Sequence, residues 1–158
     1  MDRKNGSEEF AEGGGTMCVS VYIVEDAAAV QSRLRQAISE MGTARLAGVA
    51  DCESDAIRGI VETSPDVVIL DLQLRLGSGM RVLEAIRAKG CSALVVVQTN
   101  FALPEYRERC LRHGADHFLD KTQDAWRLFE LLGEVAARCP DKSRCAGQKC
   151  SNSPPASG

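Results

Sequence analysis

The sequence predicts a doubly wound α/β fold, in which five parallel strands are covered by helices on both faces. Short runs rich in β-branched residues alternate five times with segments whose apolar residues recur at helical spacing. Several runs, such as 67–70 and 95–97, are continuously apolar, which is typical of strands buried on both faces of a parallel sheet. With 158 residues, the chain is long enough for one such domain with a tail at each end.

The first half of the predicted domain contains three strands and two helices. The strands are expected at about 19–24, 45–50 and 67–71. Between the first two, apolar residues recur at helical spacing from Val30 onward, and Gly42 provides a stop. After the second strand, Asp51 is the expected N-cap of a helix that Ser64-Pro65 ends.

The second half adds two strands and three helices. A Gly77-Ser78-Gly79 turn opens the third helix, which Gly90 ends. Pro104 suits the first turn of the fourth helix, which ends near Gly114. The remaining strands are expected at 93–98 and 116–119, and the last helix at about 123–138.

This strict alternation, written (βα)5, leaves few topologies because crossovers between parallel strands are right-handed. We expect the flavodoxin-like strand order 2-1-3-4-5, which places the first and third strands side by side at the switch point. The loops after these two strands carry Glu25-Asp26 and Asp71. The expected topology therefore brings three acidic residues to one place.

Composition and charge disfavour several classes of protein. The net charge is −3, and no basic patch or reading motif is visible, so direct binding to nucleic acid is not expected. No apolar run approaches the roughly 20 residues of a membrane helix. The polar, glycine-rich amino terminus has no signal-peptide core. We therefore expect a cytoplasmic protein without membrane contact.

The chain divides into a domain and two tails. Residues 1–16 have no hydrophobic period and are expected to be flexible, and residues 139–158 form a tail with Cys, Pro and Ser that is expected to be disordered. The domain is expected to span residues 17–138. Its cysteines lack the spacing of a metal site and are expected to be small buried apolar residues, namely Cys18, Cys52, Cys91 and Cys110.

Four of the predicted strands run directly into polar residues. Glu25-Asp26 follows the first strand and Asp71 ends the third. Thr99 follows the fourth strand, and Lys121 comes just after the fifth. The carboxyl ends of parallel strands lie at one edge of the sheet, where open α/β sheets place their ligand sites. We therefore expect these side chains to meet.

These residue types suit a divalent metal and a phosphoryl group. Carboxylates about 4 Å apart repel each other by several kcal/mol at a protein surface. Mg²⁺ relieves such repulsion, and one or two carboxylates suffice because the ion keeps several waters. A carboxylate can also act as a nucleophile toward phosphorus. Lys121 and Thr99 would then stabilise the phosphoryl oxygens.

Four segments, taken in order, resemble the receiver domain of two-component response regulators over about residues 18–138. The segments are VYIVED at 21–26, PDVVILDLQL at 65–74 followed by GSG at 77–79, VVVQT at 95–99, and GADHFLDK at 114–121. Each segment alone is a weak signal. All four in this order and at compatible spacing are a strong one.

The resemblance implies a role for each matching residue. Asp71 would accept a phosphoryl group from a histidine kinase. The implied Mg²⁺ ligands are Glu25, Asp26, Asp71 and the backbone carbonyl of Gln73. Thr99 and Lys121 would contact the phosphoryl oxygens. Thr99 and Phe118 would form a switch that changes the face made by the fourth helix, the fifth strand and the fifth helix.

Three positions depart from the family pattern. Arg75 stands where proline is usual, which predicts a looser loop after the acceptor. Asn100 replaces a small residue after the hydroxyl position and would crowd the path to Asp71. Phe118 lacks the hydroxyl of the commoner tyrosine, so it cannot donate a hydrogen bond at the switched surface.

We therefore expect a single-domain response regulator, because no output domain fits after residue 138. It would not be an enzyme beyond its own autophosphorylation and autodephosphorylation, the latter with Gln73 near the attacking water. Expected partners are a sensor histidine kinase or phosphotransfer protein, an unidentified downstream protein, and a second copy of the chain on phosphorylation. Phosphate relay onward is another output.

Two other functions remain open from the sequence. One is a receiver-like interaction module that is never phosphorylated, for which Arg75 and Asn100 are the only support. The other is a phosphohydrolase with an aspartyl nucleophile. That chemistry usually needs a second carboxylate two residues after the nucleophile, where this chain has Gln73, so it is disfavoured.

Overall fold

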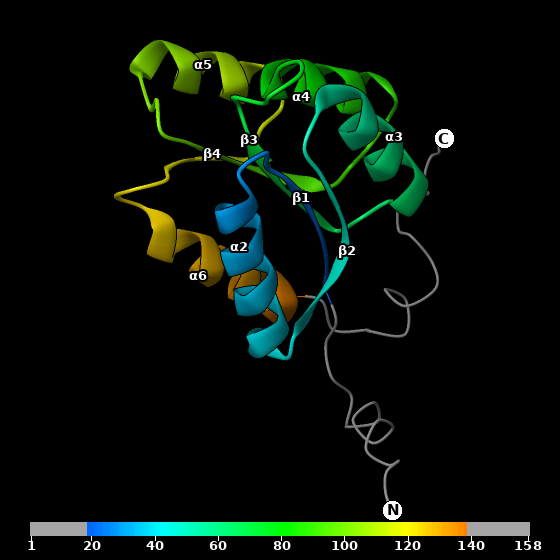
Figure 1. Ribbon diagram of the computed structural model, residues 1–158, viewed down its shortest axis with the longest axis vertical. Coiled ribbons are helices and arrows are strands. Elements are labelled where there is room, and N and C mark those ends of the chain that lie inside the picture. The colour runs from blue at the N-terminus through cyan, green and yellow to red at the C-terminus, as the bar shows by residue number, and fades with distance from the viewer. Residues whose placement is uncertain (1–18, 139–158) are drawn as a thin grey trace, which may run out of the picture.

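The computed structural model describes residues 19–138, and in that range it contains the expected alternation of strands and helices (Figure 1). The strands are β1 (Val19–Val24), β2 (Ala44–Ala50), β3 (Val67–Asp71), β4 (Leu94–Thr99) and β5 (His117–Asp120). The helices are α2 (Ala28–Met41), α3 (Glu53–Thr63), α4 (Gly79–Ala88), α5 (Pro104–Arg112) and α6 (Ala125–Ala137). The tails and Cys18 lie outside the described residues.

All five strands are parallel and follow the order β2-β1-β3-β4-β5, as predicted. The expected strand bounds agree with the observed ones to within one residue. Gly42 ends α2 in the left-handed conformation, with φ of 72°, which a residue without a Cβ adopts easily. Within residues 19–138, no helix is long and apolar enough to cross a membrane.

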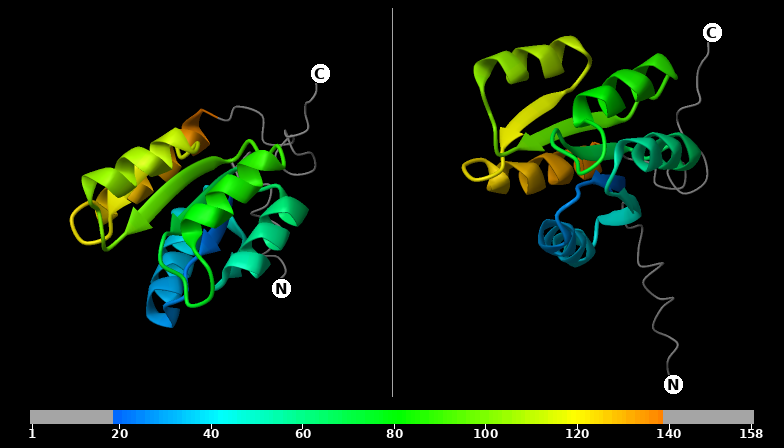
Figure 2. Two further views of the ribbon diagram at one scale, coloured as in Figure 1. Left: turned by 90° about the horizontal axis from the view of Figure 1, so that it is seen from above. Right: turned by 45° about the horizontal axis from the view of Figure 1, so that its top comes forward.

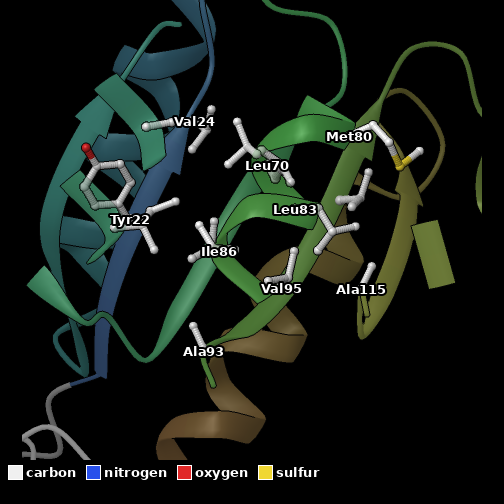
Figure 3. Packing of buried hydrophobic residues seen from close by; sticks show 14 of the residues in the cluster. Tyr22, Val24, Leu70, Met80, Leu83, Ile86, Ala93, Val95 and Ala115 are labelled. Carbon is white, nitrogen blue, oxygen red and sulfur yellow. The ribbon is translucent and has the colours of Figure 1, made fainter. Parts of the chain in front are cut away.

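The helices form one layer on each face of the sheet (Figures 1 and 2). Helices α3, α4 and α5 cover one face, and α2 and α6 cover the other. Each layer has its own apolar cluster, and the first contains Tyr22, Leu70 and Leu83 (Figure 3). The second contains Ile23 and Ile69. Successive strand residues point to opposite faces, so β1 and β3 are buried on both sides and hold the site rigidly.

The largest side chain of β1 fits because two glycines leave room for it. A Cβ on Gly59 of α3 would lie 1.9 Å from the hydroxyl oxygen of Tyr22, and one on Gly48 of β2 would lie 2.6 Å from its ring. Tyr22 is 5% exposed, and burial is the main reason that its pKa is raised. The two glycines therefore let α3 pack closely on the sheet.

Two sequence-based expectations are wrong in the structure. Asp51 is not the N-cap of α3, because the helix begins one residue later than expected and Cys52 occupies that position without a side-chain cap. The Asp51 carboxylate instead accepts a hydrogen bond from Arg75. Among the described cysteines, only Cys110 is fully buried, whereas Cys52 and Cys91 are partly exposed because they lie at helix ends.

Candidate functional site

The three acidic residues expected at the sheet edge lie together. Glu25 and Asp26 follow β1, and Asp71 is the last residue of β3, which pairs with β1 in parallel. One carboxylate oxygen from each residue lies within 4.8 Å of the others. Glu25 is 2% exposed and Asp71 6%, so water screens their mutual repulsion poorly. The donor set consists only of oxygen, as a hard cation such as Mg²⁺ requires.

Lys121, which follows β5, reaches across to two of these acids. Its Nζ lies 2.7 Å from Oε1 of Glu25 and 3.0 Å from Oδ2 of Asp71. The Lys121 side chain is only 12% exposed, so both contacts are shielded from solvent. One ammonium group therefore offsets part of the charge of two buried carboxylates that come from different strands.

Burial shifts the pKa of Glu25 and the pKa of Lys121 in opposite directions. It raises the pKa of Glu25 above its ordinary value, because the charged form loses hydration, and hydrogen bonds from Lys121 and the Ala27 amide offset this only in part. Burial alone would lower the pKa of Lys121, but the hydrogen bonds to Glu25 and Asp71 outweigh it, so the pKa is raised. Lys121 is therefore a permanent cation at neutral pH.

Thr99 ends β4 on the other side of Asp71 and is fully buried. Its hydroxyl oxygen accepts a hydrogen bond from the Phe101 amide at 3.0 Å. Its carbonyl accepts one from the Lys121 amide, also at 3.0 Å. The hydroxyl and the ammonium group are thus held by neighbouring backbone segments, which fixes their positions relative to the sheet.

The loop after Asp71 is held more firmly than the absence of proline suggested. Arg75 donates to Asp51 at 2.6 Å, and Leu76 forms a backbone bridge with Cys52. The Ser78 amide donates to Glu53 at 3.1 Å. The expected looser loop is therefore not what these contacts describe. No local sequence signal reveals such a tether, because its partners lie about 25 residues apart.

Gln73 is the second residue after Asp71, and the role of its backbone carbonyl as a metal ligand stays a prediction. Its amide donates to Oδ1 of Asp71 at 3.2 Å, which orients the carboxylate. Asn100 is exposed and, together with Lys121 and Gln98, lines a groove between α2 and α6. That Asn100 crowds the approach to Asp71 remains a prediction.

Phe118, on β5, is buried and contacts a residue that the sequence did not connect to it. The guanidinium carbon of Arg107 lies 5.8 Å from the centre of the Phe118 ring. The sequence places Arg107 with Arg109 and Arg112 on a basic helix. It carries no signal that one of the three turns toward the sheet.

A second acidic cluster lies outside the predicted site. Oxygen or sulfur atoms of Asp51, Cys52 and Asp55 also lie within 4.8 Å of one another. Asp55 is exposed, and both carboxylates already pair with arginines, Asp51 with Arg75 and Asp55 with Arg58. We assign no ligand to this cluster.

Comparison with known proteins agrees with this geometry. The family model described as the response regulator receiver domain matches residues 21–133. The transcriptional regulatory protein YvfU of Bacillus subtilis is 31% identical over 114 residues, which cover 72% of this chain and 57% of that protein. The photosynthetic apparatus regulatory protein RegA of Rhodobacter capsulatus is 30% identical, with 88% of this chain and 75% of that protein covered.

A solved structure is similar as well. A DNA-binding response regulator of the LuxR family from Staphylococcus aureus superposes with a TM-score of 0.69 at 30% identity, covering 75% of this chain and 98% of that chain. A protein-glutamate methylesterase of Myxococcus xanthus is 32% identical, but this chain spans only 39% of it. The chain thus spans about half the length of the first curated relatives it matches. The family model nevertheless covers most of it, and the chain belongs to the receiver-domain family of two-component response regulators.

Proposed function

We propose that Asp71 accepts a phosphoryl group from a phosphohistidine on a sensor histidine kinase or a phosphotransfer protein, and that the site requires Mg²⁺. The contact that best supports this is the bridge from Lys121 Nζ to Glu25 and Asp71 at 2.7 and 3.0 Å. A cation placed against a buried carboxylate lowers the repulsion that an incoming dianionic phosphoryl group would meet.

The transfer uses groups already positioned in the resting protein. An oxygen of the Asp71 carboxylate forms a bond to phosphorus while the bond from phosphorus to the imidazole nitrogen breaks, and the imidazole leaves with that electron pair. Lys121 exchanges its contact with Asp71 Oδ2 for a phosphoryl oxygen. The Thr99 hydroxyl donates a hydrogen bond to another phosphoryl oxygen. Both residues stabilise charge that develops on the transferred group.

Glu25, Asp26 and Asp71 would hold the metal ion, together with the Gln73 carbonyl. The three carboxylates lie close together and two of them are buried, so they repel one another. A divalent cation bound between them would relieve this repulsion. When bound, Mg²⁺ would supply positive charge to the transferred phosphoryl group in addition to the charge of Lys121. Gln73, two residues after the acceptor, would lie near the water that hydrolyses the acyl phosphate.

The proposed output is a protein contact on the face formed by α5, β5 and α6. Apolar side chains lie exposed on α5 and α6, among them Leu111 at 42% and Trp126 at 61%. The downstream protein, dimerisation on phosphorylation and single-domain operation all remain predictions. An interaction module that is never phosphorylated stays the alternative; of the two residues that favour it, Arg75 forms an ion pair with Asp51 in the loop tether.

Labelling with radioactive acetyl phosphate tests the proposal. The wild type should be labelled when Mg²⁺ is present and should stay unlabelled when a chelator is present from the start. Asp71→Asn should reduce labelling to background because the amide is not a nucleophile for this transfer. Asp55→Asn, which removes an exposed acid away from the site, is the matched control and should label like the wild type. Equal labelling of Asp71→Asn would overturn the assignment.

A further inference from the structure

Helix α5 is attached to the rest of the domain at very few points. Cys110 is its only buried residue. Large apolar side chains at both ends of the helix are solvent-exposed, with Leu103 46% and Leu111 42% exposed. Few buried contacts mean a low free energy of local opening. The contacts that do hold α5 therefore decide where it lies.

The first attachment runs through the backbone before the helix. The Phe101 amide donates to the Thr99 hydroxyl at 3.0 Å, and the Leu103 amide donates to the Phe101 carbonyl at 2.9 Å. The Arg107 amide then donates to the Leu103 carbonyl at 3.0 Å. A short chain of hydrogen bonds thus connects the proposed phosphoryl-contacting hydroxyl to the first turn of α5.

The second attachment is the Arg107 side chain. Its guanidinium carbon lies 5.8 Å from the centre of the Phe118 ring, within the range of a cation–π contact. Its Nη1 also donates a long hydrogen bond, 3.4 Å, to the Phe118 carbonyl. Phe118 pairs with Val97 on β4, two residues before Thr99. Both attachments of α5 therefore lead back to the same end of β4.

We propose that Arg107 is a positioning residue that clamps α5 to Phe118 in the unphosphorylated protein, and that phosphorylation of Asp71 works against this clamp. The inference rests on the proposed function. A phosphoryl oxygen that accepts from the Thr99 hydroxyl draws this side chain toward Asp71 and away from the Phe101 amide. The loop at 100–103 then loses this anchor, and Arg107 and Cys110 carry a larger share of the contacts that hold α5, beside the contact of His113 Nε2 with Glu84 at 3.4 Å.

The clamp has a measurable energetic consequence. If it stabilises only the resting position of α5, removing it raises the population of the released position. A ligand that favours the released position then binds more tightly, because less of its binding free energy is spent on the shift. One cation–π contact at a partly exposed position corresponds to roughly a two- to five-fold change in the equilibrium constant.

Binding of beryllofluoride with Mg²⁺, a mimic of the phosphoryl group, provides the first test. Arg107→Met should bind the mimic about two- to five-fold more tightly than the wild type. Arg112→Met, on the same helix but with no side-chain hydrogen bond, ion pair or cation–π contact among residues 19–138, is the matched control and should bind like the wild type. In a Phe118→Leu background, which removes the ring but keeps the backbone carbonyl, Arg107→Met should have a smaller effect than in the wild-type background. Equal affinity of Arg107→Met and the wild type would overturn the proposal.

The reactivity of Cys110 provides a second test that needs no ligand. Cys110 lies on the buried side of α5, and burial raises the pKa of its thiol to about 11, so iodoacetamide should label it slowly in the wild type. Arg107→Met should label faster at this residue, whereas Arg112→Met should not. Unchanged labelling would contradict the clamp. If no variant binds beryllofluoride, the proposed function fails, and the labelling rates still decide whether Arg107 holds the helix.

Discussion

Buried charge is the dominant physical fact at the residue scale. Glu25 and Asp71 are almost inaccessible to water, and the carboxylate of Asp26 lies beside them. One carboxylate would be enough to balance the charge of Lys121 in a purely structural ion pair. Here two carboxylates lie within 3.0 Å of the ammonium nitrogen, and a third lies close by. The excess acid costs stability, and such a cost is typical of a site built for a ligand.

The pKa of Glu25 makes this cost testable. Because burial raises it above the value in the unfolded chain, the folded state retains a proton that the unfolded state releases. The contribution of Glu25 to the free energy of unfolding therefore falls as pH rises from about 4.5 through the raised folded pKa. Glu25→Gln should remove this term, so the variant should gain stability relative to the wild type between pH 4 and pH 7.

Urea unfolding of both proteins at these two pH values, without metal, is the measurement. The difference between variant and wild type isolates Glu25 from the other acids, because every other titrating group is common to both. The stability difference could instead stay constant with pH, or the variant could lose stability relative to the wild type as pH rises. Either result would contradict the stated cause of the raised pKa.

The sequence predicted the residues of the site better than their surroundings. Glu25, Asp71, Thr99 and Lys121 follow directly from strands, and the carboxyl ends of parallel strands meet, so local pattern and topology suffice. Arg107 could not be predicted in the same way. Its contact with Phe118 depends on how a helix leans on the sheet, and no residue type or spacing encodes this.

At the scale of elements, the close approach of α4 to the end of β3 sets the position of the acceptor. Helix α4 begins at Gly79, whose amide donates to the Leu72 carbonyl at 2.9 Å. The Ser78 side chain caps the helix by accepting from the Met80 amide. A helix with an ordinary residue in its first position would be pushed away from the loop that follows Asp71.

Two glycine-to-alanine substitutions separate the close packing of Gly79 on the end of β3 from the effect of helix propensity. A Cβ on Gly79 would lie 2.1 Å from the Asp71 carbonyl oxygen and 2.7 Å from Leu72 Cα. Gly79→Ala should therefore lower the free energy of unfolding by about 1–3 kcal/mol. Gly133→Ala in α6 meets nothing within 4 Å and should raise it by roughly 0.5–1 kcal/mol. Denaturant unfolding measures both, and a Gly79→Ala variant as stable as the wild type would contradict the packing argument.

At the scale of the whole molecule, the fold was the most predictable feature. Continuous apolar runs such as 67–70 specify buried parallel strands, and right-handed crossovers then allow few strand orders. Exact helix starts were less predictable. Asp51 looked like a cap from its position alone, yet its carboxylate pairs with Arg75, which is distant in sequence. Long-range pairing overrode a local preference there.

The same architecture connects the site to a surface. The site residues follow the carboxyl ends of β1, β3, β4 and β5, which lie on the same side of the sheet. Two of these strands, β4 and β5, also carry the residues that contact the α5 segment. In the proposed switch, a change at Asp71 would reach α5 through Thr99, and the cluster residues affected first would be those that α5 touches, Cys110 and Phe118.

The most direct test of the account is to locate the phosphoryl group. The protein is incubated with acetyl phosphate and Mg²⁺, the acyl phosphate is reduced with borohydride, and the modified residue is identified by mass spectrometry of peptides. The account predicts conversion of Asp71 to homoserine, dependent on Mg²⁺, and at no other described acid. Modification at another carboxylate, or none at Asp71 while the metal is present, would contradict it.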